Sequence, residues 1–253
     1  QKIPIMILNP YVAEFIGTAI ILLFGVGVNA NVSLKKTLVE DKSPWVLITS
    51  AWGFAVFVAV FVTAQSSGAH LNPAVTLGLA VAGKFSWTLV PYYFISQILG
   101  AMLGGWLAYL TYIDQYRLAE DENTVRGTFC TGPAIRNIKN NLFSEGIGTF
   151  MLVFGALFIA GPNIEISGTE VQNFGLGALD ALPIGIVVWV IGLALGGTTG
   201  YAINPARDFG PRLMYQMLPR KNKNADWSYS WIPVIGPLIG GAIAGFIYTL
   251  LGA

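Results

Sequence analysis

Long apolar runs separated by short polar breaks follow one another along the whole chain. Six of these runs approach the ~20 mostly apolar residues that a helix needs to span the hydrocarbon core of a bilayer. They cover residues 11–31, 45–66, 89–113, 142–162, 179–199 and 231–252. The pattern predicts an all-α membrane protein with six transmembrane helices.

Two polar breaks interrupt regions that should otherwise lie within the membrane. They read "SSGAHLNPAV" at 66–75 and "TTGYAINPARDFGPR" at 198–212. The first lies in a segment of 41 residues, 43–83, that contains no Asp, Glu, Lys or Arg. That segment is too long for one span and too short for two spans with a turn. It predicts one full helix and a half-length helix that begins near Asn72, and the second break predicts another that begins near Asn204.

Both halves of the chain share these signals at nearly the same spacing. The stretch "AEFIGT" recurs as "SEGIGT", so Glu14 matches Glu145 at an offset of 131 residues. The stretch "LNPAV" recurs as "INPAR", so Asn72 matches Asn204 at an offset of 132. Two unrelated matches at almost one offset indicate an internal duplication.

Each half then holds three spans and one half helix. Because three is an odd number, the second copy must cross the bilayer upside down, which makes the halves an inverted repeat. We therefore expect a single domain over residues 1–253, with repeat 1 at about 1–113, a polar connecting loop at about 114–141 and repeat 2 at about 142–253.

Each polar break contains the tripeptide Asn-Pro-Ala, formed by Asn72, Pro73 and Ala74 and again by Asn204, Pro205 and Ala206. Asn is a preferred N-cap, and Pro is favoured at the first helical position. One such tripeptide is ordinarily no more than a capped helix in a loop. Two in inverted repeats bring two helix N-termini together near the midplane, each carrying about +0.5 of an elementary charge. The facing positive ends would oppose cations and protons.

The residues just before each half helix cannot expose free backbone carbonyls to lipid. Irregular backbone at membrane depth is tolerated where it lines a water-filled path. We therefore expect both breaks to line a pore, with carbonyls contributed by Gly68, Ala69, His70, Leu71, Ala202 and Ile203.

The stretches "SGAHLNPAVT" and "GYAINPARDFGPR" resemble the signatures of the major intrinsic protein family, the aquaporins and aquaglyceroporins, and the resemblance extends over essentially the whole chain. Asp208, Arg212 and the pair Pro237-Leu238 are similar to the glycerol-conducting branch, and to bacterial glycerol facilitators most of all. The resemblance implies the aquaporin fold, with two re-entrant half helices. It also implies a passive channel for glycerol, related small uncharged solutes and water that excludes ions and protons.

The family's narrow aromatic/arginine constriction falls on Trp52, Gly192, Tyr201 and Arg207. Two aromatic walls could hold the carbons of glycerol while the guanidinium fork of Arg207 donates to its hydroxyl oxygens. Gly192 leaves room where water-selective relatives typically carry histidine. Tyr201 stands where glycerol facilitators usually have Phe. We expect its ring to pack edge-on against Trp52 with the hydroxyl off the path; a hydroxyl in the opening would compete with Arg207 for the solute.

Two glutamates, Glu14 and Glu145, lie inside predicted spans, where a charge is expensive. They could form a proton relay, or they could accept hydrogen bonds from the irregular backbone and orient it. Their symmetric positions favour the structural role, which the resemblance also gives to Asp208. His70 is better interpreted as a packed residue that shapes the cytoplasmic mouth than as a ligand or a pH gate.

Composition agrees with a membrane protein and narrows the partners. Charged residues make up 11% of the chain, against about 25% in an average soluble domain. A net charge of +1 gives no reason to expect nucleic acid as a partner. The single His and single Cys leave a metal site unsupported. No cofactor is expected, and the expected partners are the lipid bilayer and small neutral solutes.

Other functions remain open at this point. The pore could be mainly water-selective, or tuned to lactic acid, dihydroxyacetone or urea. A proton-coupled secondary transporter also uses inverted repeats and broken helices. Against it, the symmetric glutamates are the only carboxylates in the spans apart from Asp180, the second residue of the span at 179–199. An enzyme is disfavoured because no nucleophile–base arrangement is present.

The family implies a homotetramer with one pore per subunit, in the cell membrane, with cytoplasmic termini. Only Lys2 and Lys84 of the 14 Lys and Arg would then lie in the cytoplasm. That distribution opposes the positive-inside rule. We follow the family orientation as the expectation.

Overall fold

The computed structural model describes residues 7–39, 44–159, 163–164, 172–173 and 176–252. Its long helices are α1 (Pro10–Ser33), α2 (Pro44–Ser67), α4 (Val90–Thr111), α7 (Ile138–Phe158), α8 (Leu182–Leu195) and α10 (Ile232–Leu250). Short 3-10 turns, η1 (Trp87–Leu89) and η2 (Gly177–Ala181), extend α4 and α8 at their N-termini. In the described chain, six helical stretches are long and apolar enough to cross a membrane. The predicted fold class is confirmed.

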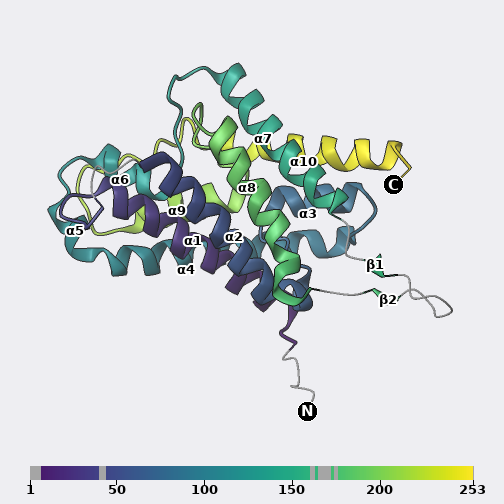
Figure 1. Cartoon of the computed structure of the whole chain (residues 1–253). Coiled ribbons are helices and arrows are strands. Elements are labelled where there is room, and N and C mark those ends of the chain that lie inside the picture. The colour runs from purple at the N-terminus through teal and green to yellow at the C-terminus, as the bar shows by residue number, and fades with distance from the viewer. Residues whose placement is uncertain (1–6, 40–43, 160–162, 165–171, 174–175, 253) are drawn as a thin grey trace, which may run out of the picture.

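The two half-length helices are α3 (Pro73–Val81) and α9 (Pro205–Met217). Each begins at the proline that follows the capping asparagine, as predicted. Helix α3 packs mainly on α10, and α9 mainly on α4, so each half helix lies against a long helix of the other half of the chain (Figure 1). The two breaks of the sequence thereby meet inside the helical assembly.

The segment at 114–141 is more ordered than the loop that its polarity predicts. It contains α5 (Ile113–Leu118) and α6 (Glu122–Phe129). Asp121 caps α6 by accepting the backbone N–H groups of Asn123 at 3.1 Å and Thr124 at 3.0 Å. Helix α7 likewise begins at Ile138, four residues before the expected 142, because its first turn is polar and capped by Asn137. Local capping extends these helices beyond the apolar pattern.

Between α7 and α8 the chain forms a small antiparallel pair of strands, β1 (Asn163–Ile164) and β2 (Gln172–Asn173). The pair projects away from the helices, on the side where the described N-terminal residues lie (Figure 1). This segment gave no strand signal in the hydropathy pattern.

Glycines allow the long helices of each half to approach closely. A Cβ on Gly100 of α4 would lie 2.2 Å from the carbonyl oxygen of Phe15 on α1. A Cβ on Gly240 of α10 would lie 2.1 Å from the carbonyl oxygen of Gly146 on α7. Small residues at such crossings let backbones pack together in membranes. These glycines therefore serve packing within one chain.

Gly240→Ala is expected to destabilise the protein, because its methyl group would overlap a backbone oxygen that cannot move away without shifting α7. Overpacking of this kind costs about 1–3 kcal/mol or more. Thermal unfolding in detergent, followed by intrinsic fluorescence, measures the loss. Gly146→Ala is the matched control, since its Cβ would lie 3.6 Å from the nearest oxygen, an ordinary contact. Equal unfolding temperatures for the two variants would contradict the packing argument.

Candidate functional site

The N-termini of the two half helices are capped by their asparagines. Asn72 Oδ1 accepts the N–H of Ala74 at 2.8 Å. Asn204 Oδ1 accepts the N–H groups of Ala206 at 3.0 Å and Arg207 at 3.2 Å. Both asparagines are buried. The side-chain oxygens are therefore consumed by the helices, and only the amide N–H₂ groups are free to act elsewhere.

Those amide groups join the two halves of the chain. Asn72 Nδ2 donates to the carbonyl oxygen of Ile203 at 2.8 Å, and Asn204 Nδ2 donates to that of Leu71 at 2.9 Å. A primary amide carries two donors, and each bond uses one. The second N–H of each asparagine can point at a passing molecule, close to the positive end of both helices.

The backbone before each half helix has an unusual conformation that is the same in both repeats. Positive φ angles occur at Gly68 (79°), Ala69 (50°), Leu71 (52°), Gly200 (78°), Tyr201 (39°) and Ile203 (44°). The second three follow the first three at an offset of 132 residues. Such angles are costly for residues other than glycine. Something outside these segments must hold them.

Glu14 supplies that support in the first repeat. Its Oε1 accepts the N–H of His70 at 2.9 Å, and its Oε2 accepts the N–H of Leu71 at 2.7 Å. The side chains of Ser67 and Gln97 donate two further bonds, both of 2.7 Å. The carboxylate is fully buried and has four donors.

Glu145 does the same in the second repeat. Its Oε1 accepts the N–H of Ala202 at 3.0 Å, and its Oε2 accepts that of Ile203 at 2.9 Å. Because these N–H groups are occupied, the carbonyls of the same segments are left to face the other way. Neither Glu14 nor Glu145 is among the described residues that line a cavity. This geometry gives no support to a proton relay through them.

The path itself consists of two cavities of about 350 Å³ each, which share Trp52, Tyr201 and Arg207 in their linings. The inner cavity contains both capping asparagines. It also includes every residue predicted to contribute pore carbonyls: Gly68, Ala69, His70, Leu71, Ala202 and Ile203. The second cavity, here called the vestibule, is lined by Asn29, Ser33, Trp45, Ile48, Trp52, Asn123, Arg126, Gly127, Cys130, Thr131, Gly132, Pro133, Gly200, Tyr201 and Arg207. The three shared residues mark the point at which the two cavities meet.

At that point a cation lies on an aromatic ring. The guanidinium carbon of Arg207 is 4.1 Å from the centroid of Trp52, and both side chains are buried. Arg207 Nη1 donates to the carbonyl oxygen of Phe129 at 3.4 Å, and Trp52 Nε1 donates to Asn29 Oδ1 at 3.4 Å. The remaining guanidinium N–H groups have no partner among the described residues, so they can serve a molecule in the path.

Comparison with known proteins agrees with this geometry. The family model described as the major intrinsic protein matches residues 4–248. The chain belongs to the major intrinsic protein family. It is 49% identical over 245 residues to a probable glycerol uptake facilitator protein of Thermotoga maritima, and the aligned region covers 96% of this chain and 100% of the relative. It is 46% identical over 244 residues to a glycerol uptake facilitator protein of Streptococcus pneumoniae, covering 96% and 99% of the two chains. The X-ray structure of the aquaglyceroporin from Plasmodium falciparum superposes with a TM-score of 0.78 at 29% identity, covering 94% of each chain.

In this major intrinsic protein, Gly192 lies against the ring of Tyr201. It is not among the described residues that line either cavity. A Cβ there would lie 2.8 Å from Tyr201 Cζ and 2.9 Å from Thr49 Cγ2. The room that the glycine leaves is therefore filled by the end of the Tyr201 ring rather than added to the path.

Tyr201 also has a different aromatic neighbour from the one expected. Among the described residues its ring contact is with Trp45, at 5.9 Å between centroids and 76° between planes, and not with Trp52. Trp45 Nε1 donates to the carbonyl oxygen of Gly192 at 3.2 Å. Sequence reasoning did not select Trp45, whose one signal is an aromatic side chain at the start of a span. It holds the ring that borders the path.

Tyr201→Phe is expected to leave the ratio of glycerol to water permeability within about twofold. Among the described residues the buried hydroxyl has no hydrogen-bond partner, and an unsatisfied buried polar group costs about 1–3 kcal/mol. Its removal should therefore stabilise the protein while the ring stays in place. Stopped-flow permeabilities and thermal unfolding measure both effects. Tyr93→Phe is the control, because Tyr93 Oη donates to the carbonyl oxygen of Ser67 at 3.0 Å and its loss should destabilise. A several-fold rise in the permeability ratio of Tyr201→Phe would place the hydroxyl in the opening.

His70 lies in an aromatic cluster at the inner cavity. Its ring is 4.5 Å from Phe85 and 4.9 Å from Tyr93 between centroids, and its Nδ1 is 3.1 Å from Thr76 Oγ1. Among the described residues no group of three or more His, Cys, Asp or Glu is placed to hold a metal ion. The geometry is that of a packed side chain.

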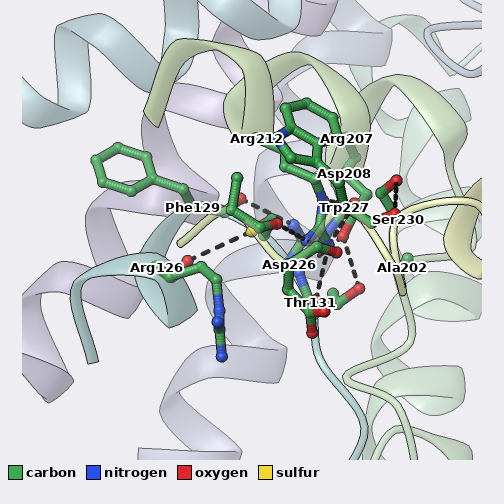
Figure 2. Close-up of polar contacts among 12 residues, drawn as sticks. Arg126, Phe129, Thr131, Ala202, Arg207, Asp208, Arg212, Asp226, Trp227 and Ser230 are labelled. Atoms are coloured by element: carbon green, nitrogen blue, oxygen red, sulfur yellow. Dashed lines mark hydrogen bonds and ion pairs between the residues drawn. The ribbon is translucent and has the colours of Figure 1, made fainter. Parts of the chain in front are cut away.

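A buried ion pair fixes the wall next to Arg207 (Figure 2). Asp208 Oδ1 accepts from Arg212 Nη2 at 2.8 Å, and both side chains are 0% exposed. Asp208 Oδ2 accepts the backbone N–H and the hydroxyl of Thr131, each at 2.7 Å. Arg212 in turn donates to the carbonyl oxygens of Thr131 and Ala225. The pair therefore joins α9 to two segments of the vestibule side.

Proposed function

We propose that the chain is a passive channel that conducts glycerol, related small uncharged solutes and water across the cell membrane and excludes ions and protons. The observation that carries the proposal is the meeting of the two cavities at Trp52, Tyr201 and Arg207. Glycerol has a carbon–hydrogen side that fits aromatic walls, and hydroxyls that can accept from a guanidinium fork. The chain is a multi-pass membrane protein and not an enzyme.

We propose that Trp52, Tyr201 and Arg207 form the constriction and contact the solute directly. Gly192 contributes to it by leaving space for the ring of Tyr201. The Asn-Pro-Ala pairs and the carbonyls before them line the rest of the path. Glu14, Glu145 and Asp208 have structural roles, which their hydrogen bonds to the backbone support.

We also propose the larger organisation that the sequence indicates. The chain forms one channel domain of two inverted repeats, at about 1–113 and 142–253, joined by the segment at 114–141. The repeated φ pattern and the reciprocal asparagine bonds support the repeat. Four copies assemble with one pore each, and the termini are cytoplasmic, as is expected for the family.

A flux experiment tests the function. Purified protein in liposomes should equilibrate glycerol down its gradient, with no dependence on an imposed proton gradient. Accumulation of glycerol above its external concentration would instead identify a coupled transporter. The same vesicles, tested with water, urea, dihydroxyacetone and lactic acid, rank the solutes. Water flux without glycerol flux would favour the water-selective alternative.

A further inference from the structure

The vestibule carries an unusual balance of charge. Two arginines, Arg126 and Arg207, are among the residues that line this cavity of about 350 Å³. No Asp or Glu is among the described residues of its lining. A channel for neutral solutes needs one fixed cation at its constriction to repel other cations. Repelling cations at the constriction does not explain why a second arginine, Arg126, lines the vestibule.

The nearby carboxylates form their hydrogen bonds and ion pairs with other groups, and Asp121 and Asp226 act on Arg126 only through space. Asp208 is bonded to Arg212 and Thr131. Asp226 pairs with Arg136 and accepts from Ser228.

Asp121 caps α6, and hydrogen bonds from Thr124 and Asn123 hold the pKa of that carboxyl below its usual range. Glu122, the acid within α6, pairs with Arg220 and accepts from the hydroxyl of Tyr215.

Both guanidinium groups keep free donors. Arg126 Nη1 donates to the carbonyl oxygen of Asn224 at 3.2 Å, which is its one side-chain bond among the described residues. Its guanidinium end carries no dashed contact to the other residues drawn in Figure 2. Arg207 likewise spends one N–H on Phe129. A guanidinium has five N–H donors in a planar fork that matches a carboxylate.

We propose that the vestibule binds small hydroxycarboxylate anions such as glycerate, with the carboxylate held by Arg126 and Arg207, and that the bound anion blocks glycerol flux. The rest of the lining fits such a molecule. Trp45 and Trp52 supply faces for its carbons, and Ser33 and Asn123 supply a hydroxyl and an amide for its hydroxyls.

The anion stops at the constriction instead of passing through it. Beyond Arg207, the described lining of the inner cavity offers no other Lys or Arg. Much of that wall is aliphatic, with Ile21, Val56 and Val188 among its residues. Moving a carboxylate there would separate it from both guanidinium groups and strip part of its hydration shell at the constriction, which is unfavourable. A neutral polyol carries no charge, so it does not incur this desolvation penalty.

The test measures glycerol flux in liposomes at pH 7 with sodium glycerate on both sides, against sodium chloride at equal ionic strength. A carboxyl group with a pKa near 4 is about 99.9% ionised at that pH. A dissociation constant of about 1 mM would give a roughly tenfold slower flux at ~10 mM glycerate. The block is the ratio of flux with and without glycerate for each variant, so that changes in basal flux cancel.

Arg126→Gln should abolish most of the block. Arg117→Gln is the matched control: Arg117 is exposed, pairs with Asp114 and does not line the vestibule, so its block should equal that of the wild type. An undiminished block in Arg126→Gln, or an equal block by chloride, would overturn the proposal.

The inference rests on the proposed function because glycerol flux is its main readout. A second measurement separates the two: the intrinsic fluorescence of Trp45 and Trp52 should change on titration with glycerate and stay unchanged in Arg126→Gln. If the wild type shows no glycerol flux without glycerate, the proposed function fails while the titration still tests the site. No fluorescence difference between the wild type and Arg126→Gln would overturn the anion site.

Discussion

An Asp208→Asn variant is expected to lose about 3–5 kcal/mol of stability, because removing one partner of a buried ion pair leaves the other charge uncompensated. Arg212 has no access to solvent in this protein, and Asp208 is its charged partner at 2.8 Å. The same change replaces one of the two acceptor oxygens with an N–H₂ donor, so Arg212 and Thr131 are left with one acceptor between them. Unfolding temperatures and chemical unfolding in detergent measure the loss.

The control for this variant is the exposed pair of Asp114 and Arg117, whose side chains are 80% and 68% exposed. Asp114→Asn should cost less than about 1 kcal/mol, as is typical of surface ion pairs. Combining Asp208→Asn with Arg212→Met should restore part of the lost stability, since no unpaired cation then remains. If the double variant were as unstable as the sum of the single variants, the charge argument would be wrong.

Arg207→Ala is expected to admit cations and larger polyols. The guanidinium lies over Trp52 at 4.1 Å, so its loss both widens the meeting point of the cavities and removes a fixed charge there. A unit charge at 4 Å interacts by about 4 kcal/mol at an effective dielectric constant of about 20. Cation leak should therefore rise by up to about 10³-fold. Liposome assays with a potential-sensitive dye measure leak, and light scattering ranks polyols by size.

Arg207→Lys separates the two effects. It keeps the charge but replaces the planar fork with a single ammonium group. Cation exclusion should persist in this variant, whereas glycerol flux should fall because the paired donors are lost. Leak from Arg207→Lys as large as that from Arg207→Ala would show that the shape of the side chain, and not its charge, excludes cations.

Features that depend on local chemistry could be predicted from the sequence. The starts of α3 and α9 follow from an asparagine cap and a proline, and both requirements lie within three residues. The inverted arrangement follows from two matched spacings. The helices α5 and α6 were missed because their short, polar sequences give no apolar period, although Asp121 before Glu122 is a capping signal of the usual kind.

Features that depend on distant contacts could not be predicted. Ala69, Leu71 and Ile203 show no preference for positive φ, and they adopt it because Glu14 and Glu145 bind the surrounding N–H groups from other helices. The direction of the Tyr201 ring depends on Trp45, far away in the chain, and on the empty position at Gly192. The spacing of residues along the sequence does not show that Trp45, Gly192 and Tyr201 meet in the folded protein.

The reciprocal hydrogen bonds of Asn72 and Asn204 are informative about the evolutionary origin of the protein. Each amide donates to a carbonyl oxygen of the opposite repeat. In an ancestral protein of half the length, the asparagine amide would also need a carbonyl acceptor. A second copy inserted in the opposite orientation would supply it. Gene duplication could then place one copy in each orientation within a single polypeptide. Once the two directions were encoded separately, they could diverge. The second copy carries Arg207 where the first keeps Val75, and this difference helps to give the two ends of the passage different chemical characters.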